Sequence, residues 1–209
     1  MPRIKAKRTS TSIDLTAMCD VSFLLLTFFV LTATARQPEP LPVDVPASTT
    51  THKVPDENLG MITVGDGGKF FFGVTGPNVR TRMLERMSEK YQVPFTADEK
   101  ARFALMESFG VPMGQLRALI ALNADQRAKP GVQKGIPSDS TDNPLDNQLK
   151  EWILAARYAT KEVNDEEMRV SIKGDAQEQY PAVKQVMDVL QDQGLNKFSL
   201  ITTLRGDNF

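Results

Sequence analysis

An almost uncharged segment near the start of the chain constrains the fold more than any other feature. Residues 21–35, VSFLLLTFFVLTATA, contain no charged side chain, and extension back to Leu15 gives 21 residues interrupted only by Asp20. About 20 predominantly apolar residues are enough for an α-helix to cross a bilayer. The sequence therefore predicts a transmembrane helix over residues 13–35.

A single aspartate does not prevent the insertion of this segment. On insertion scales a central Asp costs roughly 2.5–3.5 kcal/mol, whereas each Leu, Ile, Phe or Val contributes about 0.3–0.6 kcal/mol in favour. Ten such apolar residues lie between Leu15 and Leu31. Together they favour insertion by about 3–6 kcal/mol, against the cost of one Asp that lies off the centre of the helix.

Positive charges lie just before this segment. Residues 1–12 carry a net charge of +4, residues 13–35 carry −2 and the remainder carries −3, which together give the net charge of −1. Basic residues beside a membrane span favour the cytoplasmic side. We therefore expect residues 1–12 to form a basic cytoplasmic N-terminus and the rest of the chain after the helix to be exported. The lack of a basic excess argues against a nucleic-acid-binding protein.

Two other targeting signals share features with this segment. A cleaved signal peptide also has a basic start, an apolar core and a small-residue exit, and residues 33–35, Ala-Thr-Ala, fit that exit. Asp14 and Asp20 ahead of the core argue against cleavage. A lipoprotein signal does not fit, because Cys19 precedes the apolar core instead of following it. A permanent membrane anchor is the favoured interpretation.

The scarcity of cysteine and histidine excludes several classes of site. One cysteine and one histidine rule out a disulfide framework, a multi-cysteine zinc site and a histidine-rich metal centre. His52 stands in a polar stretch without catalytic partners and is expected to be solvated. We find no converging catalytic groups, so the sequence predicts neither an enzyme nor a bound metal or cofactor.

Asp20 shares one face of the predicted helix with three threonines. At about 100° per residue, Thr16 and Thr34 lie near −40° from Asp20, and Thr27 lies near −20°. An ionisable residue inside a membrane must face protein or water and is by default a functional hypothesis. The threonines have an alternative role as helix–helix contacts, since hydroxyl groups commonly bond between membrane helices.

Ion transfer is the chemistry that a buried carboxyl group of this kind supports. Burial disfavours the charged form, so Asp20 could cross an apolar surface when neutral and release its proton into an aqueous path. Each elementary charge that crosses the membrane potential yields about 2.3 kcal/mol per 100 mV. One helix cannot form such a path, so helices from partner proteins are required.

Residues 36–58 have the composition of a Pro/Thr-rich periplasmic linker, and residues 59–209 predict a small α+β domain. The domain has the order hairpin, helix, strand, helix, strand. A glycine-rich turn at 65–68 joins the two arms of the hairpin, because glycine supplies the positive φ angles of a tight turn. The other expected elements are a helix over 143–163 capped by Asn143, a strand over 168–173, a helix over 180–193 and a strand over 198–204.

A helical insertion at about 75–142 interrupts this order. Helices are expected over 80–91, 98–109 and 113–124, followed by a loop rich in Gly, Pro, Ser and Asp. Four large apolar residues of the second helix are expected to pack in the core or to cover the sheet, namely Phe103, Leu105, Met106 and Phe109.

Residues 13–29, IDLTAMCDVSFLLLTFF, resemble the membrane helix of the ExbD/TolR family. The family aspartate falls on Asp20, and Ala17 stands where many relatives have proline. Residues 43–50, VDVPASTT, are similar to the motif that follows this helix in ExbD proteins. Residues 170–203 resemble the strand-helix-strand end of the exported domain.

The resemblance implies a transport function rather than catalysis. It implies a bacterial inner-membrane protein with a periplasmic domain that forms a homodimer. An ExbB-like ring-forming protein would be its membrane partner and a TonB-like protein would receive the motion driven by proton-motive force. The translocated ion would pass through Asp20, and sodium stays open beside the proton. A regulatory strand is implied at Val43, Asp44, Val45 and Pro46, with a plain spacer as the other interpretation.

Two alternatives remain open for the function as a whole. The first is a TolR-like subunit that maintains the envelope, although residues 43–50 favour ExbD. The second is a membrane-tethered periplasmic binding module, in which the helix is only an anchor and no ion is transferred.

Overall fold

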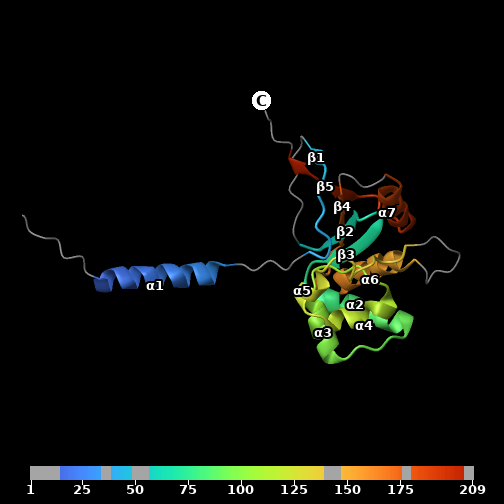
Figure 1. The fold of residues 1–209 in the computed structure, drawn as a ribbon. Helices are drawn as coiled ribbons and strands as arrows, with labels where there is room; N and C mark the ends of the chain where they lie inside the picture. The colour runs from blue at the N-terminus through green and yellow to red at the C-terminus, as the bar shows by residue number, and fades with distance from the viewer. Residues whose placement is uncertain (1–14, 34–38, 49–56, 139–146, 176–179, 205–209) are drawn as a thin grey trace, which may run out of the picture. The chain divides into compact units, whose positions relative to one another are not determined.

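The computed structural model describes residues 15–33, 39–48, 57–138, 147–175 and 180–204. It contains two compact units, which are residues Met1–Arg36 and Gln37–Phe209. The first unit holds helix α1, Leu15–Thr32, and the second holds the remaining elements (Figure 1). The predicted ends of the span at residues 13–14 and 34–35 lie outside the described residues.

A four-stranded mixed sheet forms the centre of the second unit, and its strand order is β3-β2-β4-β5. β2 pairs antiparallel with β3, whereas the pairs β2–β4 and β4–β5 are parallel. The strands are β2 Leu59–Gly65, β3 Lys69–Val74, β4 Arg169–Gly174 and β5 Phe198–Ile201. Parallel neighbours need a crossover connection, which α7 provides between β4 and β5. The domain is therefore of the α/β type instead of the predicted α+β type, because β2, β4 and β5 pair in parallel, although the element order is the predicted one.

The hairpin is confirmed, and its turn has the predicted chemistry. Asp66, Gly67 and Gly68 all have positive φ angles, at 53°, 76° and 89°. Glycine reaches this region without steric cost, so two adjacent glycines fix the position of the turn.

Six helices accompany the sheet within the described residues, and most of their ends differ from the predicted ones. The helices are α2 Pro77–Tyr91, α3 Ala97–Ala104, α4 Met113–Ala121, α5 Ala124–Arg127, α6 Gln148–Asn164 and α7 Tyr180–Asp192. α2 begins three residues earlier than predicted because Pro77 starts the helix, a position where a missing N–H costs nothing. α6 begins at Gln148, and its cap is Asn147, whose side chain accepts a hydrogen bond from the Lys150 amide at 3.0 Å; the predicted cap, Asn143, lies outside the described residues.

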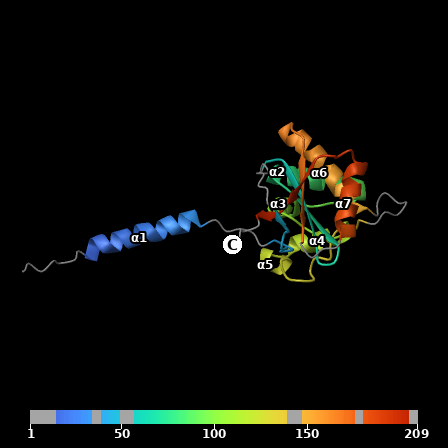
Figure 2. The same ribbon diagram turned by 90° about the horizontal axis from the view of Figure 1, so that it is seen from above.

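The insertion is also divided differently from the prediction. α3 ends at Ala104 instead of 109 because Phe109 leaves the helix and pairs with Phe72, with two backbone hydrogen bonds of 2.9 Å. α4 ends at Ala121, and Asn123 then caps the short helix α5. Figure 1 shows these insertion helices at the end of the domain away from β1, β5 and α7, and Figure 2 shows the strands in the middle of the domain.

The core lies between one face of the sheet and helices α2, α6 and α7. Ile62, Phe72 and Ile172 point from the strands into it and are fully buried, as is Trp152 of α6. The insertion adds Phe103, Met106 and Phe109, all at most 4% exposed, which confirms three of the four predicted cover residues. The fourth, Leu105, is 65% exposed because it caps α3 at the point where the chain turns away.

Candidate functional site: the carboxylate of helix α1

Helix α1 carries Asp20 within a span of suitable length and composition. It has 18 residues with a mean hydropathy of 2.0, which makes it the one helix among the described residues that could cross a membrane. Thr16, Asp20 and Thr27 all lie in this helix, so the stripe expected from a 100° rotation is present for these three residues. Thr34, the fourth predicted member of the stripe, lies outside the described residues.

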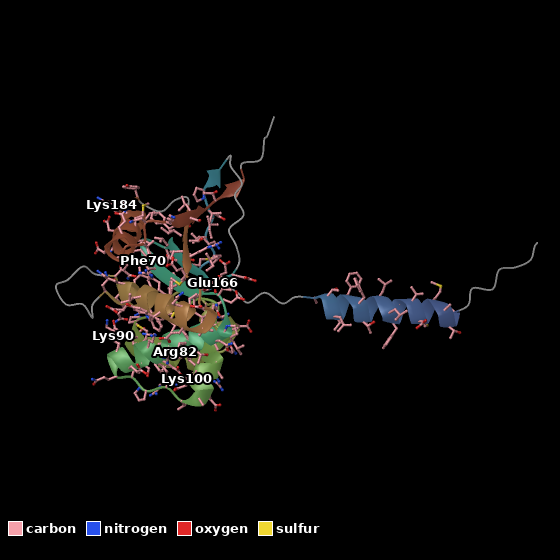
Figure 3. The ribbon with its side chains drawn as sticks, turned by 180° about the vertical axis from the view of Figure 1, so that it is seen from behind. Phe70, Arg82, Lys90, Lys100, Glu166 and Lys184 are labelled. Carbon is pink, nitrogen blue, oxygen red and sulfur yellow. The ribbon has the colours of Figure 1, made fainter. Side chains whose placement is uncertain are left out.

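None of the residues of α1 is buried within its own unit. Figure 3 shows its side chains projecting from all sides of the helix. A carboxyl group within a bilayer needs protein or water around it. A single helix cannot enclose a carboxyl group, so in a bilayer Asp20 would need further polar groups or water beside it.

The hydroxyl groups of α1 bond to the backbone of their own helix. Thr27 donates to the Leu24 carbonyl at 2.9 Å, and Ser22 donates to the Met18 carbonyl at 2.8 Å. Such bonds satisfy the hydroxyl proton without a partner and lower the cost of a polar side chain in lipid. Each oxygen keeps acceptor capacity, so the ion-handling and helix-packing roles of Thr27 both remain open.

The linker motif lies in the second unit, against the sheet. Val43, Asp44, Val45 and Pro46 come directly before β1, Ala47–Ser48, which pairs in parallel with β6, Thr203–Leu204. The paired residues thus follow the predicted strand. Pro46 has no N–H to donate to a ladder, which gives a physical reason why pairing begins after it. A regulatory role for this motif stays a prediction.

A charged cluster joins α2, α3 and α6 at the insertion end of the domain. Arg82 Nε donates to Glu162 at 2.6 Å and its Nη1 to Glu85 at 3.2 Å, and Lys100 donates to Glu85 at 2.9 Å. Arg86 also pairs with Glu162. Figure 3 shows Arg82 and Lys100 close together on this surface. Hydrogen bonds from Lys100 and Arg82 lower the pKa of Glu85, and those from Arg82 and Arg86 lower the pKa of Glu162.

This cluster predicts a loss of domain stability in acid. The folded pKa values of Glu85 and Glu162 lie below the ordinary value of 4.5. The stabilisation is therefore present above about pH 4.5 and is lost as the pH falls through the folded pKa values. We expect the thermal unfolding temperature to decrease as the pH is lowered below about 4.5. In Glu162→Gln this decrease with pH should be smaller. The same change at Glu89, an exposed position on α2, is the control and should leave the slope unchanged.

The described residues of the domain contain no cluster of metal-binding side chains. No three His, Cys, Asp or Glu side chains among them lie close enough to hold a metal ion. A hollow of about 260 Å³ lies on the second face of the sheet, between the linker and the insertion. Ligand pockets usually measure about 300–1,000 Å³ and combine apolar walls with converging polar groups. The hollow lies below this size range, and Asp20 stays the candidate functional residue.

Sequence reasoning missed one ion pair that bears on the linker. Lys173 Nζ of β4 donates to Glu39 Oε2 at 2.6 Å, although the two residues are 134 positions apart. The only sign of this ion pair in the sequence was a lysine near the end of a strand that is otherwise expected to be buried.

Comparison with known proteins finds a family whose model covers nearly the whole chain. The family model for biopolymer transport protein ExbD/TolR matches residues 6–205, which include α1, the linker, the insertion and the sheet. No curated protein and no solved structure matches the chain. The match covers nearly the whole chain, so the insertion lies within the region that the family model matches. The chain belongs to the ExbD/TolR family of biopolymer transport proteins.

Proposed function

We propose that the chain is an ExbD-like subunit of an inner-membrane energiser driven by proton-motive force. Family membership supports a role in energised biopolymer transport. The observation that carries the finer proposal is the single carboxyl group of α1, a helix long and apolar enough to cross a membrane. Asp20 would take a proton on one side of the barrier and release it on the other, within a ring of ExbB-like subunits.

The movement of charge supplies the work in this proposal. A proton that crosses the membrane potential yields about 2.3 kcal/mol per 100 mV, so a few protons are enough to drive a rearrangement between helices. The periplasmic domain, as a homodimer, would pass this motion to a TonB-like protein and so to outer-membrane uptake. A TolR-like role in envelope maintenance is the second candidate, and residues 43–50 favour the ExbD-like role.

Replacing residues 13–35 by an unrelated inert membrane helix tests the proposal against a plain tether. We expect energised uptake to fall to the level of a deletion strain, because the replacement keeps the anchor and removes Asp20. Immunoblots of membrane fractions should show an unchanged amount of protein. Replacing residues 1–12 by another basic segment is the matched control and should preserve uptake.

Co-purification from membranes completes this test. The native chain should bring along a ring-forming membrane protein, and the chain with the inert helix should not. Full uptake by the chain with the inert helix would establish a tether and refute ion transfer. Cells from which the native chain has been deleted distinguish the TolR-like role. Normal uptake together with sensitivity to detergent in these cells would establish that role.

A further inference from the structure

Two arginines of the domain are partly buried without a carboxylate partner. Among the described residues, neither Arg80 of α2 nor Arg127 of α5 forms an ion pair. Burial lowers the pKa of Arg127, and no charge of a described residue opposes this shift. Burial also lowers the pKa of Arg80, and the charge of Glu107 opposes it only in part. A cation withdrawn from water without a counter-ion is destabilised, and an anion bound beside it removes this cost.

The two arginines line neighbouring depressions in the domain surface. Arg80 lines the hollow of about 260 Å³ on the second face of the sheet, and Arg127 lines a smaller notch beside α5. Glu39, Glu107 and Ser108 belong to the walls of both, so the hollow and the notch meet at these residues. A ligand at this shared boundary has a guanidinium group on either side of it.

The insertion holds this boundary in a fixed position. Arg80 Nη1 donates to the Met106 carbonyl at 2.7 Å, which ties the insertion to α2. Phe109 pairs with β3 through two backbone hydrogen bonds of 2.9 Å. Between these contacts, Gly73 lets the Glu107 carbonyl approach the sheet, since a Cβ on Gly73 would lie 2.1 Å from this oxygen. The wall is therefore positioned before a ligand binds, which lowers the entropic cost of binding.

The charges of these walls leave an excess of one positive charge. Glu39 is neutralised by Lys173 of β4, with 2.6 Å between Nζ and Oε2. The other charged residues of the walls are Arg80, Arg127 and Glu107, which contribute +2 and −1. Complementary charge favours a ligand that carries a single negative charge.

The hollow itself is largely apolar. Leu59, Met61 and Phe71 of the sheet line it, and Leu41 of the linker lies among them in its wall. An engineered apolar cavity of about 150 Å³ binds benzene, so a hollow of about 260 Å³ has room for an aromatic ring and a short chain. A volume below that of pockets for drug-sized ligands suits a small molecule rather than a length of polypeptide.

We propose that the hollow and the notch bind a small organic acid with an apolar body and one carboxylate group. The apolar body lies on the sheet, and the carboxylate accepts hydrogen bonds from Arg80 and Arg127. Guanidinium groups bind carboxylates through charge-assisted hydrogen bonds, often as bidentate pairs. The bonds of Arg80 to two backbone carbonyls use two of its five N–H groups. This site belongs to the domain and does not depend on ion transfer through Asp20.

Binding of hydrocinnamate to the full chain in lipid nanodiscs tests the site. This probe has a phenyl ring, a short chain and a carboxylate, and its amide, hydrocinnamide, differs only in lacking the charge. Titrations followed by saturation-transfer NMR, with protein-free nanodiscs as the blank, give a Kd for each compound. We expect the carboxylate to bind at least about tenfold more tightly than the amide, as for a hydrogen bond to a charged group.

Arg127→Met tests the role assigned to the arginines. Arg127 is the better choice, because Arg80 also holds the Met106 carbonyl. The variant should bind hydrocinnamate about tenfold more weakly and hydrocinnamide as tightly as the native chain does, since only a charge contact is lost. A purely structural role would weaken both compounds equally. Arg117→Met is the matched control on α4: Arg117 is 52% exposed and pairs with Glu99, so both affinities should be unchanged.

Met61→Trp tests the place of the apolar body. The larger side chain fills the hollow from the sheet and should weaken the binding of both compounds, while the circular dichroism spectrum stays that of the native chain. Unchanged binding in this variant would place the ligand elsewhere and overturn the proposal. Equal affinity of the native chain for the acid and the amide would also overturn it, as would equal binding of the acid by the native chain and Arg127→Met.

Discussion

Replacing Asp20 by Asn is expected to abolish energised transport while the protein still inserts and accumulates normally. Asparagine keeps the shape and hydrogen-bonding capacity of the side chain but cannot carry a proton. Groups whose proton transfer is required typically contribute about 10²- to 10⁴-fold to rate, so we expect uptake at least about 100-fold lower. The measurement is energised uptake by cells that express the variant as their only copy, normalised to its level in the membrane.

Matched variants separate the loss of titration from damage to the helix. Asp20→Glu keeps a carboxyl group and should retain partial uptake, whereas Cys19→Ser, one position away and about 100° around the helix, should retain full uptake. Thr27→Val removes a hydroxyl that bonds to the Leu24 carbonyl. A strong loss in Thr27→Val would favour ion handling by the threonine stripe, and a mild loss would favour helix packing. Full uptake by Asp20→Asn would refute the mechanism.

Local signals predicted the parts of the fold that local chemistry decides. Two apolar runs and adjacent glycines were enough to predict the hairpin. An apolar stripe that ends before Gly194, which has a φ of 73°, was enough to predict α7. Helix α1, as a candidate membrane span, could be predicted from the length and hydropathy of its segment alone. The position of Asp20 on that helix followed directly.

Long-range contacts decided the parts that the sequence could not show. The apolar residues after Ala104 continue a helical pattern, yet Phe109 bonds to Phe72, 37 positions earlier, and that bond ends the helix. The contact between Glu39 and Lys173 depends on which face of β4 meets the linker, which no local window contains. Asn143 and Asn147 are equally good caps by residue type, so the sequence alone could not choose Asn147.

Replacing Trp152 by Ala is expected to cause the largest loss of stability of any single change in the domain. The indole is fully buried on α6, with its ring centroid 4.7 Å from that of Phe109 and 6.1 Å from that of Phe103. Both phenylalanines belong to the insertion, so Trp152 joins the insertion to the core. Deletion of a buried aromatic side chain costs about 3–5 kcal/mol of unfolding free energy. This is a large part of the roughly 5–15 kcal/mol that stabilises a typical domain.

Urea unfolding of the full chain in detergent micelles, followed by circular dichroism, measures this loss, because the chain has no second tryptophan to report by fluorescence. Tyr158→Ala on the same helix is the control: Tyr158 is 53% exposed and contacts Arg86, so we expect a loss of about 1 kcal/mol or less. Trp152→Phe should fall between the two, since it loses ring volume but also removes an indole N–H that has no partner among the described residues. A loss below about 1 kcal/mol in Trp152→Ala would mean that the insertion does not pack on the core.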